Sequence, residues 1–411
     1  MHFLLKNIGC FLLIASPGVT AGFAEDANIR VIHQQPSYIV STQQVELAVT
    51  ELGGHMAPVS FFRDTDKPVQ PYYVSPWQDE SPAEMPAPVL VPLRGDFFCM
   101  PFGGNSEMVA GEKHPPHGEI VGNKWHHEGT KKSGDVTTLT MSIETRVRRG
   151  RVTKELSLVD SQNVIYSRHT IAGFTGRVPL GHHATLAIPE NEGTVRLAAS
   201  PFRFGMTNPG QFSDPKLGEY QSLQPGTRWN SLTKVPVIWK GEPDADLTSL
   251  PARQGFADLV QIMNEPWEKT NGPAWMTATF SEVGYVWFSL KDASVLRSTV
   301  FWIENHGRHG HPWNGRNNCL GLEDVTAHFA DGLAASVGEN ALSREGVVTT
   351  VELKEGQPTV VNYIQGVVRV PPAFKMVQTL EFSPGQVTFI STGGERVTTP
   401  VRHEFLRTGK L

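Results

Sequence analysis

The chain of 411 residues carries 36 Lys and Arg against 41 Asp and Glu, which gives a formal net charge of −5. Nucleic-acid-binding proteins usually concentrate a basic excess on one face, so this balance argues against a nucleic-acid partner and against general affinity for anionic membranes. With 39 Gly, 30 Pro and only 19% charged residues, the composition predicts a turn-rich, mainly β globular protein rather than a disordered chain or a coiled coil.

The N-terminus has the pattern of an export signal. Lys6 precedes an apolar stretch from Ile8 to Ala15, and small residues follow up to Ala24. We therefore predict a signal peptide over residues 1–24 and a single-domain mature chain, 25–411, located in the periplasm or outside the cell. The apolar run is shorter than the roughly 20 residues of a spanning helix, so no membrane span is expected in the mature chain. An uncleaved leader that acts as an anchor is the alternative.

Alternating apolar residues predict strands along the mature chain. Val45, Leu47 and Val49 alternate with polar or small neighbours, as do four residues between 139 and 147, and this period of two is typical of a half-buried strand. Residues 275–280 and 285–288 flank a short turn and predict a β-hairpin. Further β-branched runs predict strands at 298–303, 347–353, 359–364 and 386–390.

Few segments have a helical pattern. We expect one helix around 256–263 and a short one over 324–330, with Asp324 as its N-cap. The mature chain keeps two cysteines, Cys99 and Cys319. They form either a disulfide or two buried free thiols, and neither has a second cysteine at the spacing of a zinc site.

Three stretches of the sequence concentrate residues that carry chemistry. In the first, Pro101-Phe102 is followed by Asn105, then by His117-Gly118 and Trp125. In the second, His183 opens a strand-like run over 184–188. The third, 302–324, ends on Leu322-Glu323-Asp324 and contains two tryptophans.

These motifs, in this order, resemble the galactose mutarotase-like superfamily, whose best-known members are the aldose 1-epimerases. The resemblance spans about residues 45–335. It implies a mainly β fold, a β-supersandwich of large antiparallel sheets with few short helices, and a sugar-binding cleft on one sheet face without a metal or an organic cofactor. By position, it implies that Glu323 is a base toward the anomeric hydroxyl, His183 an acid toward the ring oxygen, and His117 a group that holds the sugar.

The chemistry of mutarotation requires these residue types. Opening a cyclic hemiacetal removes a proton from O1 while another is delivered to the ring oxygen, so a base and an acid must lie on opposite sides of the anomeric carbon. A carboxylate and an imidazole can do both near neutral pH. Aromatic platforms and polar side chains are expected to make the remaining contacts to a monosaccharide or glycan: Asn105, Trp125, His182, Trp302, Arg308 and Trp313.

Several of these residues also have a purely structural interpretation. His183 is alternatively a hydrogen-bonded histidine at a strand end, and the turn before His117 alternatively presents it to solvent. Neighbours in a strand point to opposite faces, so only one of His182 and His183 can enter a cleft. Glu323 is alternatively a surface charge beside Asp324, and the tryptophans are alternatively core residues. The histidines at 306, 309 and 311 suggest a metal site, but no cysteine or carboxylate stands at a recognised ligand spacing, so we expect no metal.

Two departures from the epimerase pattern suggest a different sugar or a larger glycan. Gly104-Asn105 stands where epimerases usually have Asn-Arg, which leaves Arg94, Arg308 and Arg316 as alternative sources of an arginine, and Thr185 replaces an aromatic residue. Two other functions therefore compete with a mutarotase. One is a non-catalytic carbohydrate-binding protein. The other is a polysaccharide-cleaving enzyme, which would need Glu304 or Asp324 as a second carboxylate beside Glu323.

Overall fold

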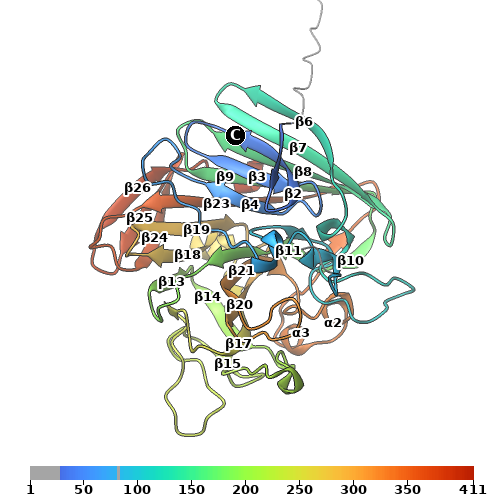
Figure 1. Cartoon of the computed structure of the whole chain (residues 1–411), viewed down its shortest axis with the longest axis vertical. Helices are drawn as coiled ribbons and strands as arrows, with labels where there is room; N and C mark the ends of the chain where they lie inside the picture. The colour runs from blue at the N-terminus through green and yellow to red at the C-terminus, as the bar shows by residue number, and fades with distance from the viewer. Residues whose placement is uncertain (1–27, 81–83) are drawn as a thin grey trace, which may run out of the picture.

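The computed structural model describes residues 28–80 and 84–411. The predicted signal peptide at 1–24 lies outside the described residues. Two large antiparallel sheets form the body of the protein, with the larger one above the other in Figure 1. The prediction of a mainly β protein with large antiparallel sheets and few short helices is confirmed.

The larger sheet has nine strands in the order β16-β13-β18-β19-β23-β9-β8-β7-β6. Two adjacent strands, β18 and β19, are buried along their whole length. The strands are β6 (His126–Ser133), β7 (Val136–Thr145), β8 (Gly150–Val159), β9 (Val164–Ala172), β13 (Val195–Ala199), β16 (Ser249–Leu250), β18 (Ala274–Phe280), β19 (Tyr285–Lys291) and β23 (Thr359–Arg369).

The second sheet has eight strands. The order is β15-β14-β17-β20-β21-β11-β5, and β12 pairs with β21 beside β11. The strands are β5 (Phe98–Cys99), β11 (Leu180–His182), β12 (Ala184–Ala187), β14 (Phe202–Thr207), β15 (Arg228–Trp229), β17 (Phe256–Asn264), β20 (Ser298–Asn305) and β21 (Asn318–Thr326).

Three small sheets and short helices surround this pair. The sheets consist of β1 (Ile29–Ile32), β2 (Gln35–Ser41), β3 (Glu46–Thr50) and β4 (Met56–Ser60); of β10 (Gly176–Val178) and β22 (Val351–Leu353); and of β24 (Val377–Ser383), β25 (Gln386–Ser391) and β26 (Arg396–Pro400). The helices are α1 (Trp267–Thr270), α2 (Leu333–Val337), α3 (Ala341–Arg344), α4 (Phe405–Thr408) and the 3-10 turns η1 (Pro76–Asp79), η2 (Pro88–Leu90), η3 (Glu119–Val121) and η4 (Pro215–Leu217).

Most of the predicted strands are present. All but the first residue of the alternating run at 45–49 lie in β3. The predicted hairpin is β18 and β19, in register from Ala274 with Lys291 to Phe280 with Tyr285. The runs at 298–303, 359–364 and 386–390 lie in β20, β23 and β25. Of the run at 347–353, only the last three residues form a strand, β22.

Both helix predictions are wrong. Residues 256–263 form β17, which lies between β14 and β20 and is buried from its second residue onward. A strand buried on both faces has no polar alternation, so its apolar spacing imitates that of a helix. Asp324 lies inside β21, and its carboxylate accepts hydrogen bonds from Ser289, Thr299 and Tyr363 and pairs with Lys291 at 2.5 Å instead of capping a helix.

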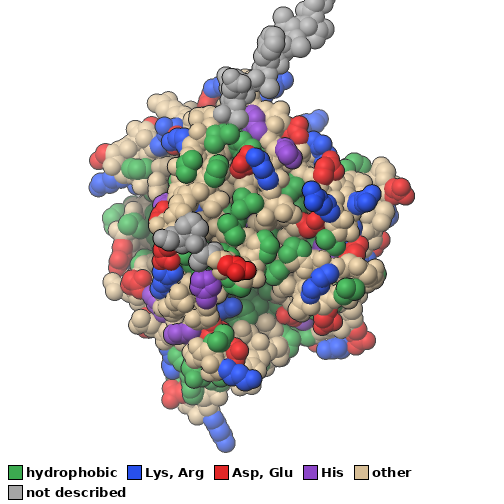
Figure 2. All heavy atoms as spheres, turned by 45° about the vertical axis from the view of Figure 1, so that its right-hand side comes forward, with side chains coloured by type: hydrophobic (Ala, Val, Ile, Leu, Met, Phe, Trp, Pro, Cys, Tyr) green, Lys and Arg blue, Asp and Glu red, His purple; other side chains and the backbone are tan. Residues whose placement is uncertain are grey.

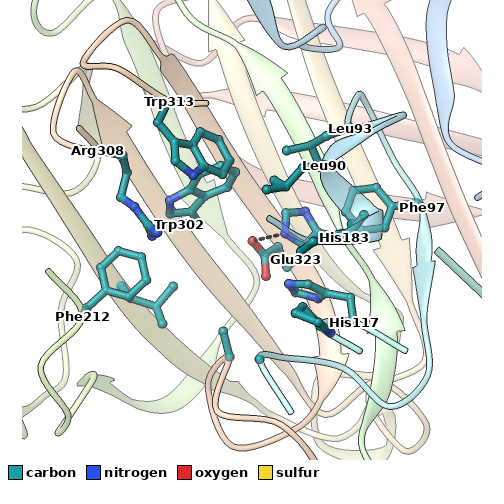
Figure 3. Close-up of a pocket in the computed structure, with 16 residues that line it drawn as sticks. Leu90, Leu93, Phe97, His117, His183, Phe212, Trp302, Arg308, Trp313 and Glu323 are labelled. Atoms are coloured by element: carbon teal, nitrogen blue, oxygen red, sulfur yellow. Dashed lines mark ion pairs between the residues drawn. The ribbon is translucent and has the colours of Figure 1, made fainter. Parts of the chain in front are cut away.

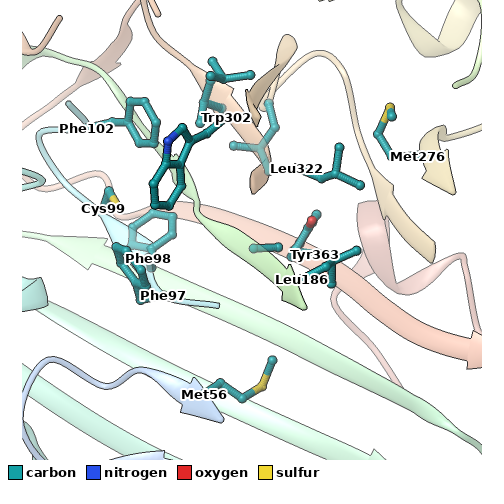
Figure 4. Packing of buried hydrophobic residues seen from close by; sticks show 14 of the residues in the cluster. Met56, Phe97, Phe98, Cys99, Phe102, Leu186, Met276, Trp302, Leu322 and Tyr363 are labelled. Carbon is teal, nitrogen blue, oxygen red and sulfur yellow. The ribbon is translucent and has the colours of Figure 1, made fainter. Parts of the chain in front are cut away.

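The contacts of Asp324 join the two large sheets, because Ser289 and Tyr363 belong to the larger sheet and Asp324 to the smaller one. Apolar side chains of both sheets fill the space around them, as Figure 4 shows for Leu186, Leu322 and Met276.

Cys99 and Cys319 are both free and buried. A second apolar cluster packs β24–β26 and α4 against the outer face of the larger sheet, for example through Phe288 and Phe389.

The surface has no large region of one charge on the face shown in Figure 2, where acidic and basic side chains are interspersed. Within 28–80 and 84–411, no helix is long and apolar enough to cross a membrane.

Candidate functional site

A cavity of about 300 Å³ lies over one face of the smaller sheet. Six of the residues predicted from the sequence line it: His117, His183, Trp302, Arg308, Trp313 and Glu323. Figure 3 shows the tryptophans, Arg308 and Phe212 on one side of the cavity and the two histidines on the other, with the carboxylate of Glu323 between them. The remaining lining is mostly apolar and comes from 87–97, Gly104, Pro116, Phe212, Leu259 and Ala330.

Glu323 reaches the cavity from the middle of β21. Its neighbour on the same face is Gly321, where a Cβ atom would lie 2.6 Å from Oε1 of Glu323 and 3.0 Å from Cβ of Trp302. The missing side chain therefore makes room for the carboxylate. Glu323 is 2% exposed, and burial raises the pKa of its carboxyl well above the ordinary value, which makes the ionised form a stronger base.

His183 faces Glu323 from the junction of β11 and β12. Its Nε2 lies 3.2 Å from Oε1 of Glu323, and its Nδ1 lies 3.2 Å from Oγ1 of Thr185. The ring stacks on Phe97 with 4.5 Å between centroids, so its orientation is fixed from both edges and one face. Burial, reinforced by the neighbouring His117, lowers the pKa of His183 well below its ordinary value, which makes the protonated ring a stronger acid.

His117 lines the cavity on the same side as His183. The sequence Pro115-Pro116 precedes it, and its backbone adopts a left-handed φ of 61°, which directs the side chain to within 5.1 Å of the His183 ring, centroid to centroid. Burial lowers its pKa to about 4, so the ring is neutral at pH 7. The backbone N–H of Gly103 donates to Nδ1 at 3.4 Å, and this assigns the proton of the neutral ring to Nε2 as a donor for a ligand.

The two tryptophans form an aromatic wall opposite the histidines. Trp302 lies edge-on to His183 at 5.9 Å between centroids, and Trp313 lies edge-on to Trp302 at 5.5 Å. The indole Nε1 of Trp302 is buried and has no hydrogen-bond partner among residues 28–80 and 84–411. An indole that offers both a π face and a free N–H suits a ring with one apolar face and polar edges.

Arg308 is placed by two buried carboxylates that bind the backbone of its own loop. Oε1 of Glu304 accepts from the N–H groups of Gly307 at 3.0 Å and Arg308 at 2.9 Å. Oε1 of Glu219 accepts from those of His309 at 2.8 Å and Gly310 at 3.0 Å. Four consecutive backbone donors are therefore satisfied by side chains, which fixes a loop that has no regular structure of its own.

The other two candidate arginines lie elsewhere. Arg94 is buried and donates to the carbonyl oxygens of Ile32, His33 and Pro92, and Arg316 pairs with Glu80 at the surface. Of the three, Arg308 is the one that the fold brings to the cavity.

Three residues expected to contact sugar do not line the cavity. Asn105 donates to the carbonyl oxygens of Pro101, Gly103 and Pro115 and accepts from the N–H of Leu333, so it ties loops together. Trp125 is fully buried and donates to the carbonyl of Ile120.

His182 is the third. It points to the opposite face from His183, into the space between the large sheets, where Nδ1 lies 2.9 Å from Asp96 and the ring stacks on Tyr363 at 4.1 Å. The strand rule that allows one of the two neighbouring histidines into a cleft holds, and His183 is the one that enters.

The alternative sites considered from the sequence are not assembled. His306 binds Glu190 and the carbonyl of Gly315, and His311 binds the carbonyl of Glu84. In the described part of the chain, no group of three or more His, Cys, Asp or Glu residues is placed to hold a metal. Asp324 is buried on the other face of β21 with Lys291, and Glu304 does not line the cavity. Glu323 is the one carboxylate among the described residues that line it.

The sequence patterns did not identify two phenylalanines that line the cavity, Phe97 and Phe212. Phe97 lies four residues before the Pro101-Phe102 motif, but its contact with His183 depends on pairing between segments about 85 residues apart. Phe212 comes from a loop between β14 and β15 that has no motif. Neither position has a sequence signal that separates it from an ordinary core phenylalanine.

No protein-family model and no curated protein sequence matches the chain. Solved structures do share its fold. A protein from Klebsiella pneumoniae described as a putative aldose 1-epimerase superposes with a TM-score of 0.58 at 11% identity, over 83% of each chain. A galactose mutarotase-like protein from Clostridium acetobutylicum superposes with a TM-score of 0.55 at 11% identity, over 84% of this chain and 98% of the other. The chain therefore has the galactose mutarotase-like fold.

Proposed function

We propose that the protein is a mutarotase that interconverts the anomers of an aldose. The observation that carries this proposal is the direct contact of His183 and Glu323, 3.2 Å apart on the floor of a cavity with aromatic walls. Burial raises the pKa of the Glu323 carboxyl and lowers that of the His183 imidazole, which favours the neutral pair with its proton on Oε1 of Glu323. Transfer of that proton to Nε2 of His183, 3.2 Å away, gives the reactive form, a carboxylate base beside an imidazolium acid.

A sugar that places its O1 hydroxyl against Oε1 of Glu323 and its ring oxygen against Nε2 of His183 replaces their direct contact and reacts without any change in proton count. Glu323 takes the proton of the O1 hydroxyl, the bond from C1 to the ring oxygen breaks, and His183 gives its Nε2 proton to that oxygen. The product is the open-chain aldehyde. Rotation about the C1–C2 bond presents the other face of the carbonyl, and the reverse proton transfers close the ring to the opposite anomer.

The remaining residues have supporting roles in this proposal. His117 donates from Nε2 to a hydroxyl of the sugar, and Trp302 and Trp313 cover its apolar face. The site favours this chemistry over cleavage of a glycosidic bond, because a glycosidase needs two carboxyl groups across the bond and Glu323 is the one carboxylate among the described lining residues.

NMR tests the proposal by following freshly dissolved α-anomers of a panel of aldoses. Wild type should accelerate interconversion of at least one, and Glu323→Gln and His183→Ala should each lower kcat by about a hundredfold or more, the usual contribution of a general acid or base. Glu339→Gln and His126→Ala, both at exposed positions, are the matched controls and should behave as wild type. Binding of sugars without any acceleration would instead identify a carbohydrate-binding protein.

We further propose that the protein is exported, on the pattern of residues 1–24. N-terminal sequencing of the protein recovered from periplasm or medium tests this. A mature N-terminus near residue 25 is expected, and a chain that starts at residue 1 and stays with the membrane would indicate the anchored alternative.

A further inference from the structure

A second cavity, of about 800 Å³, adjoins the candidate site. The two cavities share four lining residues, Leu90, Phe212, Arg308 and Trp313. The smaller cavity, which contains His183 and Glu323, has a volume of about 300 Å³, at the lower end of the range for small-molecule pockets. The larger one opens on the side away from His183, where Figure 3 shows Arg308 and Phe212. We propose that this outer cavity is a second sugar subsite, and that the substrate is a reducing disaccharide or longer oligosaccharide.

The junction of the two cavities is built for a sugar that extends through it. The guanidinium carbon of Arg308 lies 5.4 Å from the ring of Phe212 and 5.5 Å from that of Trp313, so the cation is held between two aromatic side chains that face both cavities. Its Nε is buried without a hydrogen-bond partner among the described residues. A glycosidic oxygen or a neighbouring hydroxyl at the junction would supply the acceptor.

The charges of the outer cavity favour a neutral sugar unit over a phosphate group. Its lining contains two acidic residues, Asp214 and Glu219, two basic ones, Lys216 and Arg308, and one histidine, His311. Arg308 lies 3.7 Å from Oε1 of Glu219, which offsets its positive charge. A phosphate site would concentrate basic groups and backbone donors instead, and here the backbone donors of the loop are already bound by Glu219 and Glu304.

Polar side chains that are free to bind hydroxyls also line this cavity. Gln211 and Lys216 are exposed there, and Leu217 covers its edge from the 3-10 turn η4 with 52% of its surface exposed. These residues do not line the catalytic cavity. They can therefore be changed to alter the second subsite alone.

This inference rests on the proposed mutarotase function, and its test separates the two. Initial rates of anomer interconversion are measured for glucose and galactose and for maltose, cellobiose and lactose, with wild type, Lys216→Ala and Leu217→Trp. At least one disaccharide should have a kcat/KM about tenfold above that of its monosaccharide. Lys216→Ala removes one donor and should lower the kcat/KM of the disaccharide about fivefold, the usual effect of a lost hydrogen bond. Leu217→Trp narrows the outer cavity and should lower the same kcat/KM by a similar factor. The monosaccharide values should stay within about twofold, and Lys234→Ala, at an exposed position outside both cavities, should change neither.

The outcomes differ for the two proposals. If monosaccharides are interconverted but no disaccharide is preferred, or Leu217→Trp lowers both classes equally, the second subsite is refuted and the mutarotase stands. Binding of methyl glycosides, measured by calorimetry, covers the reverse case. If no sugar is interconverted but a methyl disaccharide binds more tightly than a methyl monosaccharide, and Leu217→Trp removes the difference, the subsite is supported and catalysis is refuted. Absence of both catalysis and binding refutes both.

Discussion

Glu304 gives the sharpest physical prediction, because its buried carboxyl makes folding depend on pH in a way that an amide does not. The side chain is 0% exposed, and Oε2 has no hydrogen-bond partner among the described residues. Burial raises the pKa of Glu304 to about 8, although the backbone donors of Arg308 and Gly307 and the charge of Arg308 offset part of the effect. Glu304→Gln keeps an acceptor for both donors and cannot ionise.

The sign and size of the effect follow from the two pKa values. The folded-state pKa of about 8 lies above the ordinary value of 4.5, so between these values the unfolded chain binds fewer protons and stability falls as pH rises. Each pKa unit corresponds to about 1.4 kcal/mol. Between about pH 5 and about pH 8 this carboxyl should therefore cost wild type roughly 4 kcal/mol of unfolding free energy, and the Gln variant should not lose it.

Urea unfolding of both proteins at several pH values measures the difference. Its pH dependence is the relevant quantity, because the amide Nε2 that replaces Oε2 adds a cost that is the same at every pH. Glu219→Gln is the matched control on the same loop. Burial tends to raise the pKa of Glu219, but the N–H groups of Gly310 and His309 and the charge of Arg308 outweigh it and lower that pKa overall. The stability that this carboxylate contributes is present above its unfolded pKa and is lost as pH falls.

Glu304→Gln should therefore gain stability relative to wild type toward high pH, and Glu219→Gln should be destabilised at neutral pH. The difference in unfolding free energy between Glu304→Gln and wild type should change with pH. A change of less than about 1 kcal/mol between pH 5 and pH 8 would falsify the conclusion that Glu304 is buried as a neutral carboxyl.

Three further predictions test how the fold builds the site. Gly321→Ala places a Cβ atom 2.6 Å from Oε1 of Glu323, so mutarotation should fall at least tenfold, and unchanged rates would show that the carboxylate has other room. Leu322→Ala, on the buried opposite face of β21, should cost about 2–5 kcal/mol in urea unfolding, and a loss below 1 kcal/mol would contradict tight packing between the sheets. Trp125→Phe removes the hydrogen bond to Ile120 and should cost about 1–3 kcal/mol with sugar binding unchanged in calorimetry; weaker binding would place Trp125 at the ligand after all.

Local patterns predicted most strands because a half-buried strand leaves a period of two in the sequence. The hairpin of β18 and β19 and the strands β3 and β7 follow from such patterns. The failure at β17 has the same physical origin. A strand between two others, covered on both faces, has no exposed position that requires a polar residue, and its sequence no longer distinguishes a strand from a helix.

In the candidate site too, the sequence predicted the place of some residues correctly and that of others incorrectly. Motif order in the sequence led to Glu323, His183 and His117, which the structure brings into one cavity, with Glu323 3.2 Å from His183. It also led to Asn105 and Trp125, which the structure uses to fix loops and fill the core. Residue type and spacing cannot separate a polar group that faces a ligand from one that satisfies a neighbouring carbonyl.

The sequence by itself therefore determined the mainly β class, most strands and three of the polar groups on the cavity floor, because these depend on residue type and on short-range periodicity. Only the tertiary structure decided which of His182 and His183 enters the cavity, which arginine reaches it, and how Glu304 and Glu219 hold the loop of Arg308. These depend on pairings between residues up to about 145 positions apart. The face that a side chain occupies is set by strand register, which is fixed when the sheets pack together.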